Sequence, residues 1–561
     1  MLAAPLFGQG PPAGYTDYEK FRFRVRELGR SDLVTVKSLA TTLGGREIYL
    51  LKLGHGEIDK KPAMLIVGGV ESDRLAGGEI CIAMAMRWSR QHKKDAALTK
   101  LFDRYTIYII PRPSPDATER CFGKPYGLSA TNQRPTDDDR DGVTDEDPPE
   151  DLNGDGWITK MRVEDPAGLY MPHPQDARVM IKADPKKGER GRYRLLSEGK
   201  DNDGDEAWNE DGPGGVRFNK NFTFAYPFFK VGAGPHQVSE IETRAIADFA
   251  FSRPNIAMVV SFTPEDNLMH PWKPNAGAES KRIKTTLFTD DAAYVKRIAE
   301  KYRKIHGEKN APTSPKGAGS FSEWAYFHYG RWSFASRPWW IPKPKDAVAK
   351  TGDAKKTDGK DKKENDKDKA DKKADDKRGT DQLNTLRWLK REKIDGFVEW
   401  TEVKHADFPG RKVEVGGFKT LLTQNPPHKQ ISVLAEKQAK FAVELLGQMP
   451  RVSIGETKVE SVGEGVFRLQ VTVVNTGYLP TLSKMGAISQ LTFPLILSLE
   501  LPKGAKLVTG HLRTHLGPLA GTNGRSKHTW LILAKDAKAR TVRASVASPS
   551  VGKSEKTVKL P

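Results

Sequence analysis

The chain has 561 residues, of which 37% are hydrophobic and 29% charged, a composition typical of folded globular proteins rather than fibrous or wholly disordered ones. This length predicts about two to four domains. No run of roughly 18 or more apolar residues occurs, which excludes a membrane-spanning helix. Cys81 and Cys121 are the only cysteines, and two thiols exclude both a disulfide framework and a thiolate metal site.

The formal net charge of +19 would suit a polyanionic partner or an anionic surface. No stripe of Arg and Lys interleaved with aromatic residues is present, so we interpret most lysines as lying on solvated faces and keep nucleic-acid or polyanion binding as the less favoured alternative. Residues 1–14 are assigned to an N-terminal segment. Met1 to Gln9 lack the basic start and apolar core of a signal peptide, and we keep open the interpretation that they are the remnant of one whose start was misplaced.

The elements up to residue 262 predict an α/β domain. A capping box at Thr16 and Glu19 opens an amphipathic helix, and a second box, Ser239 to Glu242, opens a helix that runs through Phe251. Apolar runs predict strands at 47–53, 63–67, 105–110 and 256–262 and a helix at 78–91. Strands that alternate with helices of this length indicate a mostly parallel, buried sheet.

The composition changes abruptly at 343–382, where Lys, Asp, Ala and Gly dominate. Such a segment buries too little apolar surface to offset the entropy of ordering it, so we predict a disordered insertion. A helix at 432–447 belongs to a segment, 383–449, that completes the α/β domain of 15–342. In 450–561 the apolar runs lie at 465–476, 491–501, 528–533 and 541–547, separated by Gly, Pro and Asn, and they predict a β-sandwich domain.

Three acidic segments carry side-chain oxygens at alternate positions within the loops 137–162 and 199–212. This spacing wraps oxygen ligands around a hard cation, and a glycine at the sixth position, Gly142 or Gly156, allows the sharp turn. The twelfth-position Glu is missing, and the third segment also lacks the sixth-position glycine. We predict structural calcium rather than solvated acidic loops, most clearly in the first two. The candidate ligands are Asp137, Asp139, Asp141, Asp145, Asp151, Asn153, Asp155, Asp201, Asp203 and Asp205.

Five short motifs follow one another in the order and at the approximate intervals of a known family. They read Gly44-Gly-Arg46-Glu-Ile48, Gly68-Gly69-Val70, Pro115-Asp116, Gly215-Val-Arg-Phe-Asn219-Lys220-Asn221-Phe222, and Gly234-Pro with Ser239-Glu240 and Glu242-Thr243. On these motifs, residues 15–340 resemble the zinc carboxypeptidases of the carboxypeptidase A type. The resemblance implies an α/β/α sandwich around a mixed sheet, and hydrolysis of C-terminal peptide bonds at a catalytic zinc ion.

The resemblance also assigns the zinc ligands, and this chain departs from each of them. The family holds zinc with a His-x-x-Glu pair and a distant His, and leaves one position open for an activated water. Glu71 stands at the first His, Arg74 at the Glu, and Phe262 at the distant His. One arginine within about 6 Å of a zinc ion repels it by roughly 5 kcal/mol at an effective dielectric near 20. We therefore predict that the catalytic zinc site is lost.

The general base is replaced too. Counting the family's interval onward from Glu323 reaches Arg337. We expect Arg74 and Arg337 to replace the charge of the metal and to pair with Glu71 or a neighbour. For substrate binding, the resemblance assigns Asn219, Lys220 and, in a less certain register, Arg162. The leading hypothesis is therefore a pseudopeptidase that binds a peptide, a protein C-terminus or another carboxylate.

Two other hypotheses stay open. In the first, the protein is an active metallopeptidase with relocated ligands among Glu71, Asp73, Glu79, His270, Glu265 and Asp266, and with Glu399 as the base. In the second, it is a scaffold or polyanion-binding protein whose partner contacts the β-sandwich or the basic surface. We favour a structural place for Glu399 at a sheet edge. The resemblance and the calcium loops favour an extracytoplasmic location, periplasmic or secreted, whereas the oligomeric state is undetermined.

Overall fold

The computed structural model describes residues 13–127, 130–138, 140–209, 211–212, 214–343, 378–535 and 541–561. The predicted insertion therefore lies largely outside the described residues, as do Asp139 and the segment 1–12. The described helices include α1 (Tyr18–Leu28), α2 (Ala76–Gln91), α3 (Ala96–Arg104), α4 (Pro115–Arg120), α5 (Ile241–Ser252), α6 (Ala276–Glu279), α7 (Thr289–His306), α8 (Phe321–Phe327), α10 (Thr380–Glu392), α11 (Thr420–Gln424), α12 (Ile431–Gly447) and α13 (Lys484–Ser489), with short 3-10 turns η1 (Ile58–Lys60), η2 (Pro185–Lys187), η3 (Phe218–Lys220) and η5 (His428–Gln430). No helix in these ranges is long and apolar enough to cross a membrane.

The central sheet has the order β1-β2-β4-β3-β9-β10. Its strands are β1 (Val34–Thr41), β2 (Glu47–Leu53), β3 (Ala63–Val67), β4 (Thr106–Ile110), β9 (Ile256–Phe262) and β10 (Trp332–Ser336). β1, β2 and β4 pair antiparallel, whereas β4, β3, β9 and β10 pair parallel. The prediction of a mixed, mostly parallel sheet is confirmed.

Helices cover both faces of this sheet because alternate strand residues point to opposite sides. In β3, Met64 and Ile66 pack in the core beneath α1, α2, α7 and α12. Leu65 and Val67 pack on the other face against α5 and α8. All five residues of β3 are buried, which is why its sequence is a continuous apolar run rather than an alternating one.

Both predicted capping boxes are wrong in detail, although the helices themselves are confirmed. α1 is capped by Asp17, whose carboxylate accepts from the Lys20 N–H. Thr16 instead donates to the buried carboxylate of Glu79. α5 begins after Glu240, which makes no side-chain cap bond.

A second sheet, which the sequence did not predict, has the order β11-β12-β5-β8-β6-β7. It consists of β5 (Lys160–Glu164), β6 (Tyr170–His173), β7 (Asp176–Lys182), β8 (Tyr193–Ser197), β11 (Phe397–Val403) and β12 (Val413–Phe418). The segment 383–449 therefore divides: α12 packs on α2 and α7, whereas β11 and β12 join the second sheet. Most residues of β6, β7 and β8 are only partly buried, so their sequences lack a clear apolar pattern.

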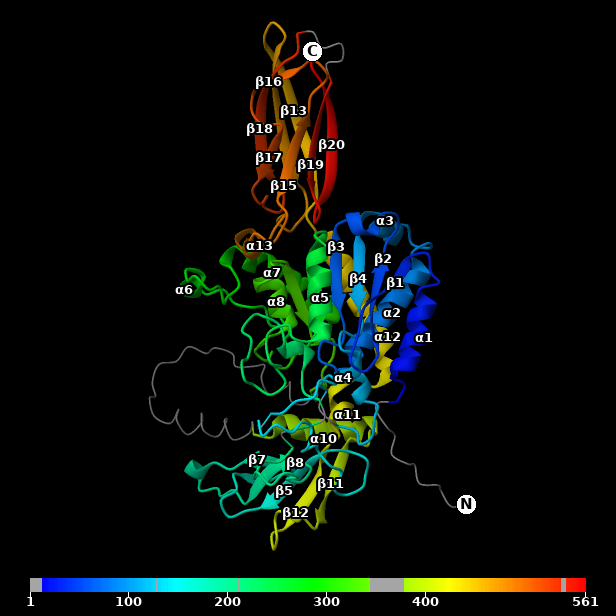
Figure 1. The fold of residues 1–561 in the computed structure, drawn as a ribbon, viewed down its shortest axis with the longest axis vertical. Coiled ribbons are helices and arrows are strands. Elements are labelled where there is room, and N and C mark those ends of the chain that lie inside the picture. Colours follow the sequence, from blue (N-terminus) through cyan, green and yellow to red (C-terminus); the bar gives the residue numbers. More distant parts are fainter. Residues whose placement is uncertain are drawn as a thin grey trace, which may run out of the picture.

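The C-terminal residues form two facing four-stranded sheets, β13-β14-β18-β16 and β17-β15-β19-β20. The strands are β13 (Val452–Gly463), β14 (Val466–Asn475), β15 (Leu495–Glu500), β16 (Lys506–Thr509), β17 (Arg513–Leu516), β18 (Gly524–Leu533), β19 (Thr541–Ser548) and β20 (Gly552–Lys559). Their inward residues share one apolar core, so the β-sandwich prediction is confirmed. In Figure 1 this domain lies at the top, the α/β domain in the middle and the second sheet at the bottom.

Candidate functional site

The family's site residues lie in loops that leave the parallel strands β3, β9 and β10. Because these strands are parallel, their carboxyl ends meet at one edge of the sheet, which is the usual place for a ligand site in an open α/β sheet. Glu71 and Arg74 follow β3, Glu265 follows β9, and Arg337 follows β10 directly. Asn219 reaches the same edge from η3.

An acidic half of the site is organised by Asn219. Its amide Nδ2 lies 2.8 Å from Glu71 Oε1 and 2.8 Å from Glu265 Oε2, and donates to both. Its Oδ1 accepts from the Phe321 N–H at 3.0 Å. Both amide hydrogens and the carbonyl oxygen of Asn219 are therefore engaged within the protein. This residue holds two carboxyl groups together and has no hydrogen left for a substrate.

The pKa values in this half are raised. Burial, then Asp73 and Glu265, raise the pKa of Glu71 to about 7, against the Asn219 hydrogen bond and the charge of Arg217. Burial and the charge of Glu323 raise the pKa of Glu265 to about 7. Burial alone raises that of Glu323 to about 7. At neutral pH these carboxyl groups are only partly ionised.

This shift makes a prediction for Glu323. Between pH ~4.5 and ~7 the folded protein holds a proton on Glu323 that the unfolded chain has released, so the free energy of unfolding falls as pH rises through this window. Glu323→Gln removes the titration. We expect its stability relative to the parent chain to increase by about 2 kcal/mol between pH ~5 and ~8, after allowance for partial solvent screening. Urea unfolding at several pH values measures this, with the exposed Glu399→Gln as the control; parallel curves for Glu323→Gln and the parent would contradict it.

A basic half of the site consists of Arg74 and Arg337. Arg74 Nη1 donates to the Gln424 carbonyl at 3.3 Å, and Arg337 Nη2 donates to the Pro264 carbonyl at 2.9 Å. Among the described residues, neither guanidinium has a carboxylate within 4.0 Å, and the buried Nε of Arg337 has no hydrogen-bond partner. The expected ion pair of these arginines with Glu71 is therefore wrong; Glu71 Oε1 accepts instead from Asn219 Nδ2.

Arg74 and Arg337 influence each other electrostatically and line the same cavity. Burial, followed by the charge of Arg74, lowers the pKa of Arg337, against the opposing charges of Asp266 and Glu265. Both guanidiniums line a cavity of about 720 Å³ at the boundary between the α/β domain and the α10–β12 region. Its wall also includes the aromatic rings of Trp339, Trp340 and Phe418. Two like charges held together in a partly apolar cavity favour an anionic ligand.

The residues at the family's zinc positions do not fit a zinc ion. Glu71 supplies a carboxylate, but Arg74 supplies a positive charge and Phe262 supplies no ligand atom. Phe262 is 2% exposed and packs in the apolar core. Of the three positions, only Glu71 carries a ligand group, and its Oε1 accepts from Asn219 Nδ2.

Of the proposed relocated ligands, Glu71 and Glu265 share Asn219, and Asp73 lies close enough to Glu71 for its charge to raise the pKa of Glu71. The other three have partners elsewhere. Glu79 is buried under α1, where its carboxylate pairs with Arg24 at 2.8 Å. Asp266 accepts from the backbone N–H groups of Leu268 and Arg337, and His270 Nε2 lies 2.8 Å from the Pro312 carbonyl.

Two further predicted residues belong to the second sheet rather than to this site. Arg162 of β5 pairs with Glu414 at 2.8 Å and stacks over Trp400. Glu399 lies on the edge strand β11 and pairs with Arg178 at 3.4 Å, in the sheet-edge place that we favoured. Lys220 Nζ donates to the Val231 carbonyl at 3.1 Å.

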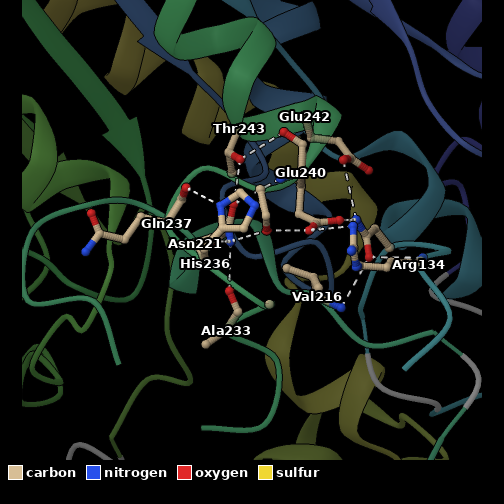
Figure 2. A network of polar contacts seen from close by, with 12 residues as sticks. Arg134, Val216, Asn221, Ala233, His236, Gln237, Glu240, Glu242 and Thr243 are labelled. Atoms are coloured by element: carbon tan, nitrogen blue, oxygen red, sulfur yellow. Dashed lines mark hydrogen bonds and ion pairs between the residues drawn. The ribbon is translucent and has the colours of Figure 1, made fainter. Parts of the chain in front are cut away.

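Most residues of the family motifs form hydrogen bonds that hold the segments around the site in place. Figure 2 shows Asn221 at the centre of one network: its Nδ2 donates to the Ala233 and His236 carbonyls, and its Oδ1 accepts from Thr243. Asn132 Nδ2 donates to Glu240 at 2.7 Å and to Glu242 at 3.4 Å. The network joins the segment that carries Asn219 to the start of α5.

Other motifs pair with one another in the same way. Arg46 Nη1 and the Gly44 N–H both donate to the buried carboxylate of Asp116, at 2.9 and 2.8 Å. The sequence motifs therefore located the residues whose hydrogen bonds support the site. They missed Gln424, Trp339 and Trp340, which lie outside the motifs and come to the site only through folding.

The described residues of the three acidic segments form the same pattern of turn hydrogen bonds. In each, the first aspartate accepts from the N–H of the fourth and sixth positions, and the fifth accepts from the seventh. The fourth and sixth positions are left-handed in all three loops: Arg140 and Gly142, Gly154 and Gly156, Gly204 and Glu206. Glu206 adopts a φ of 72° where the other loops have glycine, so the missing glycine does not prevent the turn.

Among the described residues, three carboxylates come close together in the third segment, for which the sequence pattern was least complete. One carboxylate oxygen from each of Asp201, Asp203 and Asp205 lies within 4.8 Å of the other two. In the second loop, Ile158 N–H donates to the Tyr126 carbonyl at 2.7 Å, which ties the loop to the core. Asp145, a predicted ligand of the first loop, accepts instead from the Gly214 N–H at 2.8 Å.

Comparisons with known proteins also find similarity to zinc carboxypeptidases. Residues 25–147 match the family model of zinc carboxypeptidases, and residues 451–559 match a family described as a domain of unknown function. Carboxypeptidase D of Anas platyrhynchos is 30% identical over 109 residues, 19% of this chain and 8% of that protein. Carboxypeptidase D of Homo sapiens is 32% identical over 144 residues, 24% of this chain and 10% of that protein. The chain thus spans a tenth or less of these relatives.

Among solved structures, thrombin-activatable fibrinolysis inhibitor is 14% identical with a TM-score of 0.34, over 57% of this chain and 65% of that one. The match to the zinc carboxypeptidase family model lies in the N-terminal part of the α/β domain, which includes the β3–α2 segment with Glu71 and Arg74 and the paired Arg46 and Asp116. Residues 25–147 are therefore similar to the zinc carboxypeptidase family, and this similarity covers the N-terminal part of the α/β domain.

Proposed function

We propose that this protein binds a carboxylate-bearing ligand, such as a peptide or protein C-terminus, and does not hydrolyse it. The observation that carries the proposal is the pair Arg74 and Arg337. They stand at a family zinc-ligand position and at the family base position, line one cavity, and have no carboxylate partner within 4.0 Å among the described residues. Guanidinium groups recognise carboxylates through charge-assisted, often bidentate hydrogen bonds.

The substrate-binding residues carried over from the family support a narrower role than the resemblance implies. Asn219 already donates both amide hydrogens to Glu71 and Glu265, and Arg162 already forms an ion pair with Glu414. We therefore assign carboxylate recognition to Arg74 and Arg337, with Trp339 and Trp340 available for an apolar side chain next to the carboxylate.

The test compares binding with turnover. Short peptides that end in Phe, Leu or Lys are titrated against the full chain, each with a free and with an amidated C-terminus. We expect the free acids to bind on the order of 100-fold more tightly, since the amide lacks the charge that two guanidiniums recognise. No C-terminal residue should be released over prolonged incubation with added zinc. Equal binding of acid and amide, or zinc-dependent release of the terminal residue, would overturn the proposal.

We also propose that calcium orders the three acidic loops and has a structural role. The shared turn conformation supports this, as does the triad of Asp201, Asp203 and Asp205. Several carboxylates at such separations repel one another, and a bound hard cation removes that repulsion. Calcium loops of this kind support a location outside the cytoplasm, where calcium is plentiful.

A further inference from the structure

A row of two histidines and two aspartates lies at the C-terminal end of α2, apart from the site described above. His55 Nδ1 lies 2.8 Å from Asp103 Oδ1, and His55 Nε2 lies 3.3 Å from His92 Nδ1. His92 Nε2 in turn lies 3.3 Å from Asp32 Oδ1. His92 is the C-cap of α2, His55 follows β2, Asp103 belongs to α3, and Asp32 lies between α1 and β1.

The carboxylates at the two ends determine which ring nitrogens carry protons. A neutral His55 donates from Nδ1 to Asp103, and a neutral His92 carries its proton on Nε2, toward Asp32. The two inner nitrogens, His55 Nε2 and His92 Nδ1, then face each other with lone pairs only. A hydrogen bond between them needs an additional proton, which makes one ring an imidazolium. Burial lowers the pKa of His92, so this charged form is disfavoured.

A metal ion satisfies both lone pairs at once. Two nitrogens bound to one tetrahedral zinc ion at about 2.0–2.1 Å lie about 3.3 Å apart, which is the separation found here. A carboxylate on the outer nitrogen of each metal-bound histidine is also the usual arrangement around zinc. The helix C-terminus at His92 adds partial negative charge, which favours a cation.

The surrounding charges permit a divalent ion. Asp32 and Asp103 supply two negative charges. Lys93 Nζ lies 2.6 Å from Asp32 Oδ2 and offsets part of one of them. Lys61 Nζ donates to the backbone carbonyls of His55 and Phe102, and burial lowers the pKa of this amine.

We propose that His55 and His92 bind one divalent transition-metal ion of the zinc type, with Asp103 and Asp32 orienting the two rings. Nitrogen ligands select such ions over calcium, which prefers oxygen. This site is separate from the position at which the family holds zinc, and it does not depend on the proposed function.

The test is a zinc titration of the chelator-treated full chain, kept in excess calcium so that the acidic loops are filled. We expect one zinc per chain at about pH 7.5 and markedly weaker binding at about pH 5.5, where protons compete for the ring nitrogens. His55→Gln should weaken binding on the order of 100-fold, and Asp103→Asn by about 10- to 100-fold. Both side chains reach solvent, so these variants are expected to fold, and their unfolding curves check this.

Two controls separate the possible outcomes. His515→Gln, an exposed histidine of the β-sandwich, and Glu71→Gln should leave zinc binding unchanged. Absence of zinc binding, or equal binding by His55→Gln, would overturn this inference without touching the proposed function. Zinc that is lost in Glu71→Gln but kept in His55→Gln would overturn both, because the ion would then occupy the family position.

Discussion

Removal of calcium is expected to lower the midpoint of thermal unfolding of this protein by about 10 °C or more. A ligand present at about 100 times its dissociation constant stabilises the folded state by about 2.7 kcal/mol per site, and three loops share the same turn conformation. A change of 1 kcal/mol shifts the midpoint of a domain of about 200 residues by roughly 2–4 °C. Differential scanning calorimetry with calcium and with a calcium-selective chelator measures the shift.

Substitutions in the acidic loops test whether the calcium-dependent shift of the unfolding midpoint arises there. Asp205→Asn removes one charge from the triad and should reduce the calcium-dependent shift by about one third. Asp290→Asn, an exposed acid outside the loops, is the matched control and should keep the full shift. A midpoint that is the same with calcium and with chelator would exclude a structural calcium site in these loops.

Replacement of both cavity arginines should abolish carboxylate binding. One charge-assisted hydrogen bond contributes about 1.5–3 kcal/mol, so Arg74→Gln or Arg337→Gln alone should weaken binding of a free C-terminus by about 10- to 100-fold. The double variant should lose on the order of 1000-fold or more, measured by isothermal titration with the free-acid peptides.

The amidated peptides and two further variants make this test specific. The amidated peptides should bind the double variant and the parent chain equally, because no carboxylate is present to be recognised. Arg337→Lys keeps the charge without the planar fork and should fall between the parent and Arg337→Gln. Arg244→Gln, an exposed arginine of α5, should bind like the parent. Unchanged affinity in the double variant would mean that the ligand, if any, binds elsewhere.

Under the proposed function, the two halves of the site account for the loss of the family's zinc chemistry. In the family, one zinc ion provides the positive charge at the centre of the site. Here, Arg74 and Arg337 provide positive charge on one side, while Glu71 and Glu265 share Asn219 on the other. Burial keeps these carboxyl groups partly protonated at neutral pH, which weakens their attraction for a cation. The charges of the two guanidiniums repel each other, and under the proposed function a bound carboxylate offsets this repulsion.

The sequence by itself determined the elements whose residues are buried on regular patterns. β3, β4 and β9 are buried at every residue and appear in the sequence as mainly apolar runs, whereas the more exposed edge strand β1 was not predicted. α12 and β14 bury residues at intervals of a helical turn and of two residues, so each period was visible in the sequence. It also supplied the prediction that Glu71, Arg74, Phe262 and Arg337 stand at the family's ligand and base positions, because short motifs in register locate positions without any knowledge of contacts.

Only the tertiary structure decided the partners of these residues. Asn219 lies far along the chain from Glu71, and no local pattern shows that its amide takes the carboxylate expected to pair with Arg74. The second sheet joins β5 to β12 across about half the chain, through strands that are only partly buried and so carry no periodic signal. Hydrogen bonds and ion pairs between distant segments depend on which side chains folding brings within about 3 Å, and that choice is made by the packing of the whole chain rather than by any one segment.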